Sequence, residues 1–392
     1  MTSIRLDAQR RSFARAAVLT ITHPSASPED ADGAQPHGAL DGLDSWTMQT
    51  EAMVMRATGG PEVLERATIE LADPGPREVR IRVRAVALNH IDLWARKGLP
   101  HFKYEFPHRL GADVSGEIDA LGPGASGAKV GDPVIVNPGL SCGACERCLL
   151  GQDTFCRQYK ILGENTQGGY SRHIVVPDAN VLPMPKGLSF TDAAAIPLCF
   201  LTAWQMVVRK AQVRPGQTVL VQAAGSGVSS AAIQIAKMLG ARVFTTTSTD
   251  EKAARAKALG ADEVINYTTQ DFVAECKRLT DKKGVDVVIE HVGGDVFVKS
   301  ILAAAWGGRI VTCGATAGFT PTVDLRHIFF RQVEVLGSTM GPKGDLFGIS
   351  RLVEAGKLKP VVDRVLPLWS AVEAHQLLEA RRVFGKIVLA VD

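Results

Sequence analysis

The chain has 392 residues, of which 46% are hydrophobic and 22% are charged, and its formal net charge is +3. This charge is far from the strongly basic balance of a nucleic-acid-binding surface, and no apolar run reaches the roughly 20 residues that a membrane-spanning helix needs. The length exceeds what one hydrophobic core usually covers. We therefore expect a soluble, cytoplasmic protein with two domains.

Residues 1–51 differ in composition from the rest of the chain. Residues 1–28 contain four arginines and one acid, a bias that is typical of organelle transit peptides. Residues 23–45 are rich in Pro, Gly, Ser and Asp, so they predict disorder. Because methionines recur at positions 48, 53 and 55 and the folded pattern starts at Ala52, we interpret this leader as a mis-assigned start, with organelle targeting as the alternative.

Residues 52–183 predict short strands joined by turns. In residues 79–88 the apolar Val79, Ile81 and Val83 alternate with arginines, which indicates a half-exposed antiparallel strand. Further strands are expected at 116–121, 133–136 and 171–176, separated by glycine-rich turns. This pattern is typical of a small domain resembling a β-barrel.

Four of the seven cysteines lie within fifteen residues, at Cys142, Cys145, Cys148 and Cys156. Two CxxC steps and a fourth thiol suit tetrahedral thiolate coordination of one zinc ion. Disulfides and an iron–sulfur cluster are the alternatives. Since four protein ligands leave no open position, we expect this zinc to brace the loop at about 140–157 and to take no part in chemistry.

Residues 218–241 predict a strand, a turn of small residues and a helix. Residues 218–222 form a β-branched run typical of a buried parallel strand, and residues 229–239 repeat apolar side chains at helical spacing. A helix N-terminus that backbone can approach closely suits a dinucleotide pyrophosphate, although an ordinary strand–helix connection is the alternative. The predicted cofactor contacts in this turn are Ala224, Gly225, Ser226, Gly227 and Val228.

After the turn, strand and helix signals alternate. Strands are expected at 242–247, 263–266, 285–292, 309–314 and 333–337, completing a parallel sheet with right-handed crossovers. We expect Gly314 to lie beside the cofactor, and Glu290 and His291 to end their strand near it. From Met340 the chain should return to the first domain with helices at 344–354 and 369–382 and a strand at 386–391.

The glycine-rich turn, the four-cysteine segment and the motifs GADVSGEI and GGYSRHIVVP together resemble the medium-chain dehydrogenase/reductase superfamily over residues 52–392. The resemblance implies an α/β protein with a GroES-like β-barrel-type catalytic domain (52–199 and 339–392). A Rossmann domain with a doubly wound parallel sheet (200–338) is inserted into it. We expect the chain to form a homodimer or a homotetramer.

The chain departs from the zinc alcohol dehydrogenases of that superfamily at each ligand of the catalytic metal. Those enzymes use a Cys in a CHTD-like segment, the His of a GHE segment and a later Cys or acid. Here the segments read NHID at 89–92 and GAD at 111–113. The third position falls on Leu198, and neighbouring Cys199 is expected to point elsewhere. A catalytic zinc needs about three protein ligands, so none is predicted.

Without a Lewis acid, an already polarised hydride acceptor is favoured. The ALNHIDLW segment resembles the zinc-free quinone oxidoreductase and enoyl reductase branch, which implies that NADPH reduces a quinone or an activated C=C bond of a small electrophile. We expect Asn89 to line the substrate pocket and Asp92 to orient it, with Tyr104 and His90 as candidate proton donors. Alternatively, Asn89 only bonds backbone groups, Asp92 caps a helix and Tyr104 packs.

Cofactor choice depends on the end of the strand at 242–247. An NAD enzyme typically has an acid there to bind the ribose 2′-hydroxyl, whereas this chain has Thr247. Together Thr247, Ser248 and Lys252 offer hydrogen-bond donors and one positive charge, which favours NADPH over NADH. An alcohol dehydrogenase or carbonyl reductase, and a non-enzymatic NADPH-binding protein, are the alternative functions.

Overall fold

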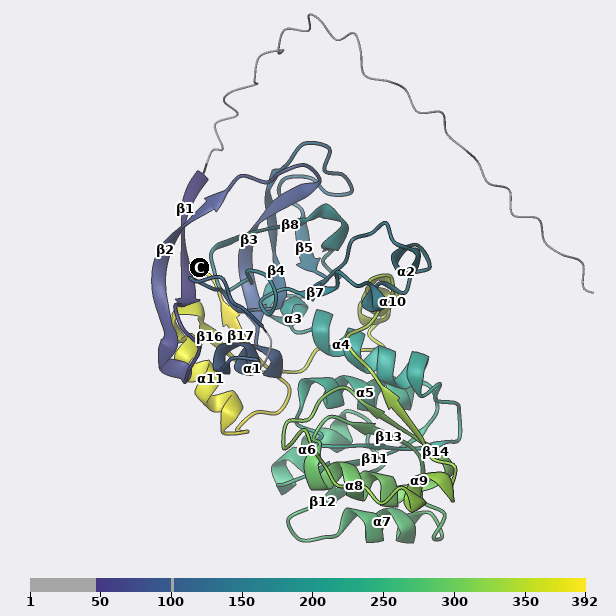
Figure 1. Ribbon diagram of the computed structural model, residues 1–392. Helices are drawn as coiled ribbons and strands as arrows, with labels where there is room; N and C mark the ends of the chain where they lie inside the picture. The colour runs from purple at the N-terminus through teal and green to yellow at the C-terminus, as the bar shows by residue number, and fades with distance from the viewer. Residues whose placement is uncertain (1–46, 100–101) are drawn as a thin grey trace, which may run out of the picture. The chain divides into compact units, whose positions relative to one another are not determined.

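The computed structural model describes residues 47–99 and 102–392 (Figure 1). Residues 1–46 of the predicted leader therefore lie outside the described part. The predicted end of the leader at residue 51 was wrong, because strand β1 (Thr47–Met55) pairs along its whole length with β2 (Leu64–Ala72). The start of β1 is polar, so its sequence pattern did not predict a strand.

The first domain is built around a seven-stranded sheet with the order β16-β17-β3-β4-β5-β9, in which β8 also pairs with β3. In β3 (Glu78–Ala87) the predicted alternation is confirmed: Val79, Ile81 and Val83 are buried, and intervening arginines form ion pairs with acids on β4. The other strands are β4 (Asp113–Leu121), β5 (Pro133–Val136), β8 (His173–Pro177), β9 (Val181–Pro183), β16 (Val362–Pro367) and β17 (Lys386–Ala390).

The second domain contains a six-stranded parallel sheet with the order β12-β11-β10-β13-β14-β15. In the predicted apolar run, Val219 and Val221 belong to the core on one face of the sheet and Leu220 to the core on the other. This confirms the doubly wound α/β fold. The strands are β10 (Thr218–Val221), β11 (Arg242–Thr247), β12 (Glu263–Asn266), β13 (Val285–Glu290), β14 (Ala304–Thr312) and β15 (Glu334–Gly337).

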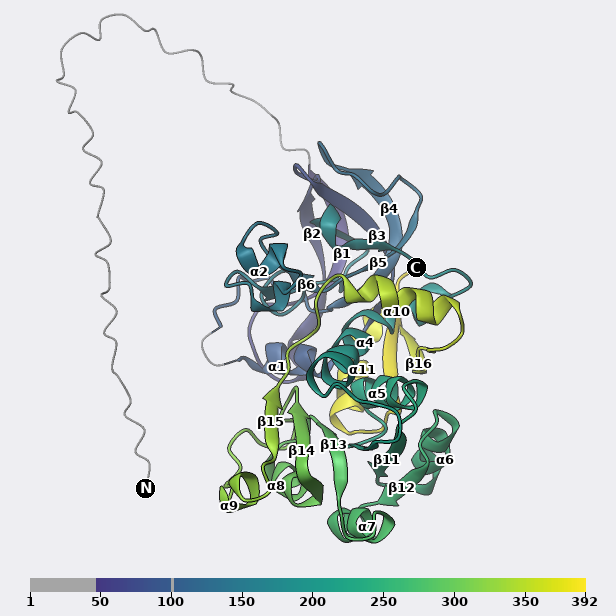
Figure 2. The same cartoon turned by 90° about the vertical axis from the view of Figure 1, so that its right-hand side faces the viewer.

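Helices cover both faces of the parallel sheet. Helices α4 (Pro197–Trp204) and α5 (Gly227–Met238) pack side by side against one face, while α7 (Phe272–Leu279) and α8 (Gly294–Ala303) pack against the other (Figure 2). The remaining helices are α1 (His90–Lys97), α2 (Glu146–Leu149), α3 (Phe190–Ala194), a π-helical segment (Gln205–Lys210), α6 (Asp250–Ala258), α9 (Arg326–Phe329), α10 (Asp345–Glu354) and α11 (Ala371–Glu379).

The order of the parallel strands creates a crevice for a ligand. From the neighbouring strands β10 and β13 the chain proceeds outward in opposite directions, to β11 and to β14. The carboxyl ends of such a strand pair are where open α/β sheets bind ligands. No helix within residues 47–99 and 102–392 has the length and apolar character to cross a membrane.

Candidate functional site

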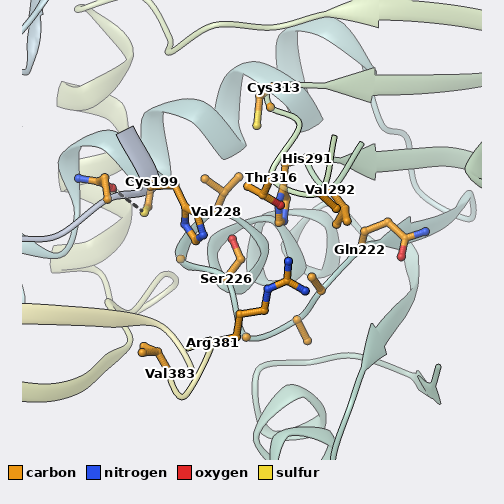
Figure 3. Close-up of a pocket in the computed structure, with 18 of the residues that line it drawn as sticks. Cys199, Gln222, Ser226, Val228, His291, Val292, Cys313, Thr316, Arg381 and Val383 are labelled. Carbon is orange, nitrogen blue, oxygen red and sulfur yellow. Dashed lines mark hydrogen bonds between the residues drawn. The ribbon is translucent and has the colours of Figure 1, made fainter. Parts of the chain in front are cut away.

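A cavity of about 770 Å³ lies beyond the carboxyl ends of β10 and β13. Both domains contribute to its wall. The second domain supplies the turn before α5 and the ends of β11, β13 and β14, and the first domain supplies residues around α1 and the start of β17. Figure 3 shows part of this wall, with Ser226, Val228 and His291 from the second domain and Arg381 and Val383 from the C-terminal segment.

The turn between β10 and α5 presents the free end of a helix to this cavity. Ser226 is the N-cap of α5, and its hydroxyl makes no capping hydrogen bond. A Cβ atom added at Gly227 would lie 2.6 Å from Cys199 Sγ and 2.9 Å from Lys386 Cδ. Glycine is therefore required there by close packing, and the first N–H groups of α5 remain open to an anion.

Ser229, in the first turn of α5, points into the protein interior. Its hydroxyl is fully buried, donates a hydrogen bond of 2.6 Å to the carbonyl of Gln222 and lies 2.8 Å from His291 Nε2. Ser229 therefore joins α5 to β10 and β13, and its hydroxyl does not face the phosphate end of the cavity. Burial lowers the pKa of His291 to about 4, so this imidazole is neutral at pH 7.

The predicted 2′-phosphate contacts lie together at the carboxyl end of β11. Thr247, Ser248 and Lys252 all line the cavity. The Thr247 hydroxyl is buried and has no hydrogen-bond partner among the described residues, which leaves a donor for a ligand. Burial lowers the pKa of Lys252, whose ammonium donates to the carbonyl of Arg381 at 2.8 Å.

The C-terminal segment 381–386 closes the cavity, and sequence reasoning missed its contribution. The Arg381 side chain is directed into the pocket (Figure 3), so a second positive charge lies near Lys252. The N–H of Gly385 donates to the carbonyl of Gly225 at 2.9 Å, which ties this segment to the glycine turn. These residues lie more than a hundred positions from the turn in sequence, so no local motif could connect them.

At the other end of the cavity, a hydrogen-bonded cluster surrounds Asn89. Its Oδ1 accepts from the Lys386 ammonium, and its Nδ2 donates to Asp113 Oδ2 at 2.9 Å and to the Ala87 carbonyl at 3.3 Å. Lys386 and Asp113 form a buried ion pair of 3.0 Å. Asn89 lines the cavity, where the sequence placed it. Its side-chain amide, however, already makes these hydrogen bonds within the protein.

Cys199 belongs to the same cluster. Its Sγ lies 3.8 Å from Asn89 Oδ1 and lines the cavity. The expectation that this side chain points elsewhere was wrong, because α4 starts at Pro197 and directs Cys199 toward α1. Burial raises the pKa of the Cys199 thiol, so it is neutral at pH 7. Burial also lowers the pKa of Lys386, but Cys199 and Asp113 more than offset this and raise it above its ordinary value.

Asp92 contacts backbone groups. Its carboxylate accepts from the N–H of Asn89 at 2.7 Å and from the N–H of Gly111 at 2.9 Å, so it caps α1 and holds it against the first sheet. It makes no hydrogen bond to the Asn89 side chain within the described residues; Asp113 and Lys386 contact that amide instead. Burial raises the pKa of Asp92 to about 6.

The two candidate proton donors are placed differently. Tyr104 is not among the residues that line the cavity; its ring packs 5.0 Å from that of His108. Burial raises the pKa of its hydroxyl, which has no hydrogen-bond partner among the described residues. His90 does line the cavity, but burial lowers its pKa to about 4 and leaves it neutral. Gly314 also lines the cavity, as expected. A Cβ atom added to it would lie 3.5 Å from the Trp94 ring.

The four predicted zinc ligands converge in a separate lobe framed by β6 (Gly139–Leu140) and β7 (Lys160–Ile161). The Sγ atoms of Cys142, Cys145, Cys148 and Cys156 all lie within 4.8 Å of one another, and three of their separations are 3.6, 3.6 and 3.9 Å. Tetrahedral Zn–S bonds of about 2.3 Å place sulfurs about 3.8 Å apart. The thiols therefore fit one closed metal site, and their separations are too long for disulfides.

A family model described as alcohol dehydrogenase GroES-like domain matches residues 75–186, and one described as zinc-binding dehydrogenase matches residues 227–355. An NAD-dependent alcohol dehydrogenase of Saccharolobus solfataricus is 33% identical over 338 residues, which cover 82% of this chain and 95% of that protein.

Two further relatives differ in their described activities. A quinone oxidoreductase of Pseudomonas aeruginosa is 33% identical over 345 residues, covering 85% of this chain and 97% of that protein. A crystal structure described as an NAD-dependent alcohol dehydrogenase is 58% identical with a TM-score of 0.85, and the match covers 87% of this chain and 100% of that chain. The relatives therefore agree in family and differ in the activity that their names state.

Proposed function

Because the chain belongs to the medium-chain dehydrogenase/reductase superfamily and is an NAD(P)H-dependent oxidoreductase, we propose that it transfers hydride to a quinone or an activated C=C bond without a catalytic zinc. The observation that carries this proposal is the cluster around Asn89. A metal there would need about three ligands and an open position, but the Lys386 ammonium already bonds Asn89 and Asp113. A buried cation at these oxygens disfavours a second cation.

The cavity fits NADPH, which would supply the hydride. The N-terminus of α5, with Ser226 and Gly227, would hold the pyrophosphate, since the first N–H groups of a helix have no partner within the helix. The Thr247 hydroxyl, which has no hydrogen-bond partner in the described part of the chain, and the two cations Lys252 and Arg381 support binding of a 2′-phosphate. NADH is the less favoured alternative, because position 247 holds a threonine and not an acidic residue that would bind a free ribose diol.

An apolar wall at the Asn89 end supports a small electrophilic acceptor. Ile91, Leu198 and Met340 belong to one apolar cluster and line the cavity, and Trp94 lies beside them in α1. Such a wall excludes water, which strengthens the electrostatic effect of the polar groups nearby. It suits the ring of a quinone or the carbon skeleton of an enone.

We also propose that the chain pairs with a second copy of itself through β15. This strand lies at the edge of the parallel sheet, and Val335 on it is 42% exposed. Trp306, on the neighbouring strand β14, and Phe329 and Phe330, at the end of α9, are also exposed. An exposed apolar sheet edge is a template for pairing. Pairing through β15 would give a homodimer, and a homotetramer would need a further surface.

We propose a cytoplasmic location, because a reducing compartment would keep the four thiols of Cys142, Cys145, Cys148 and Cys156 available for a metal ion.

The 58% identical structure described as an alcohol dehydrogenase favours a second candidate, oxidation of an alcohol or reduction of a carbonyl. Purified protein should be assayed with quinones, enones, enoyl-thioesters, alcohols and ketones, using both cofactor pairs, and its zinc content measured. Turnover of quinones or enones with NADPH and one zinc per chain would support the proposal. Two zinc ions with alcohol oxidation would overturn it, and no turnover on any acceptor would indicate a cofactor-binding protein without activity.

A further inference from the structure

Glu164 places a carboxyl group at the wall of the cavity. It follows β7 and lines the cavity near Ile91, Leu198 and Met340, which form one apolar cluster with Ile161. Within residues 47–99 and 102–392, no group donates a hydrogen bond to this carboxylate, and no cation forms an ion pair with it. The carboxyl is therefore available to a ligand.

The loop that carries Glu164 is firmly held. The N–H of Glu164 donates to the Ile161 carbonyl at 3.1 Å, and the Asn165 side chain accepts from the N–H of Ile161 at 2.8 Å. Gly163 has a φ of +78°, and an added Cβ there would lie 2.7 Å from the nitrogen of Gly111. This close contact fixes the loop backbone against the segment that precedes β4, so the Cα atom of Glu164 is kept at one place beside the cavity.

The surroundings of Glu164 favour its protonated form. Burial is the largest cause and the charge of Asp92 on α1 the second, and together they raise the pKa of Glu164 to about 7. The other titratable groups that face it are the hydroxyls of Tyr104 and Tyr159. Burial raises the pKa of both hydroxyls, so they are neutral at pH 7 and add no charge. A large share of the carboxyl groups therefore carries a proton at neutral pH.

Other groups in the wall are less suited to give up a proton. The Lys386 ammonium is held by Asn89 and Asp113, and the Cys199 thiol lies against the same amide. His90 is neutral, and a neutral imidazole is a poor acid. Glu164 combines an acidic proton with a free carboxyl in the cavity wall.

We propose that Glu164 is the proton donor of the reaction, an inference that rests on the proposed function. Bound NADPH would supply a hydride, with both electrons of the C–H bond that it loses, to the β-carbon of an enone. The π electrons of the acceptor move to its carbonyl oxygen and form an enolate. The enolate α-carbon then takes the proton of the Glu164 carboxyl, whose O–H bond breaks. After product leaves, the carboxylate regains a proton from water.

The test compares full-length wild-type protein with Glu164→Gln, and with Glu105→Gln as a matched control. Glu105 is an exposed carboxylate of the same domain that does not line the cavity. Steady-state rates with an enone and NADPH are measured from about pH 5 to about pH 9, and NADPH binding is measured by fluorescence. For the wild type, kcat/KM should be constant at low pH and fall as pH rises through about 7, because Glu164 must be protonated.

Glu164→Gln should lower kcat about 100-fold and remove the inflection near pH 7, with the Kd of NADPH unchanged, whereas Glu105→Gln should match the wild type. Glu164→Asp should keep an inflection at reduced kcat, and it provides the test if the glutamine variant does not fold. If the wild type turns over and Glu164→Gln has the same kcat and pH profile, the role of Glu164 would be overturned while the proposed function would stand. No wild-type turnover with any acceptor would overturn the proposed function and this inference with it.

Discussion

Replacing Lys386 by methionine tests whether the buried ion pair beside the cavity stabilises the fold. Methionine keeps most of the apolar stem, which packs against Gly227, and removes the ammonium. Asp113 would then be left fully buried, with the N–H of Leu198 and the Asn89 amide as its remaining donors. The variant therefore isolates the effect of the charge from that of side-chain packing.

The expected loss follows from the geometry of the pair. Nζ and Oδ2 are 3.0 Å apart, and the two side chains are 5% and 0% exposed, so solvent screens them little. Removing one partner of such a buried pair costs about 3–5 kcal/mol, because the other charge stays buried. This corresponds to a fall in Tm on the order of 10 °C.

Urea unfolding followed by circular dichroism measures this loss, with Lys357→Met as a control at an exposed lysine. The control should change the free energy of unfolding by no more than about 0.5 kcal/mol. Adding Asp113→Asn to Lys386→Met should restore part of the stability, since the orphaned charge is removed. An unfolding midpoint for Lys386→Met equal to that of the wild type, or strictly additive losses in the double variant, would refute the reasoning.

Arg381→Ala should raise KM for NADPH by about 10- to 100-fold and leave KM for NADH nearly unchanged, because only the 2′-phosphate loses a charge-assisted partner; Arg382→Ala, which alters the neighbouring arginine outside the cavity wall, should change neither. Gly227→Ala should weaken cofactor binding at least 10-fold in fluorescence titrations, since its Cβ would lie 2.6 Å from Cys199 Sγ; wild-type affinity would contradict this placement of the pyrophosphate. Cys148→Ser should lose most of the zinc found by metal analysis and unfold at lower temperature, and full zinc content would argue against the four-thiolate site. Val335→Lys should shift the protein to monomers in light-scattering measurements, because a charge would occupy the exposed sheet edge; an unchanged mass would exclude pairing through β15.

The sequence predicted those parts of the fold whose signals are local. The apolar run of β10 and the helical spacing in α5 arise within one stretch of chain, so strand, turn and helix were placed correctly. The convergence of the four thiols was predicted for the same reason, since they lie within fifteen residues. The start of β1 was missed because its pairing with β2 decides the structure of a polar segment.

The cavity was predicted less completely, because long-range contacts build much of it. Lys386 looked like part of an apolar strand, and only the pairing of β17 with β3 brings its ammonium to Asn89. Cys199 was misplaced because its direction depends on where α4 starts, at Pro197, and this start turns the thiol toward Asn89. Glu164 lies in a turn without a recognisable motif, and its burial becomes visible only when the cavity is assembled.

The position of residues 381–386 in the chain bears on how the protein is made. Translation reaches this segment after every other part of the cavity wall. Before residues 381–386 leave the ribosome, the nascent chain can already form the strands of both sheets that precede them. Asp113 then still lacks the Lys386 ammonium, and the Gly225 carbonyl still lacks the N–H of Gly385. A truncated product therefore carries a recognisable nucleotide-binding turn without a complete pocket around it. We therefore expect a chain that stops before residue 381 to bind the cofactor more weakly than the full-length chain.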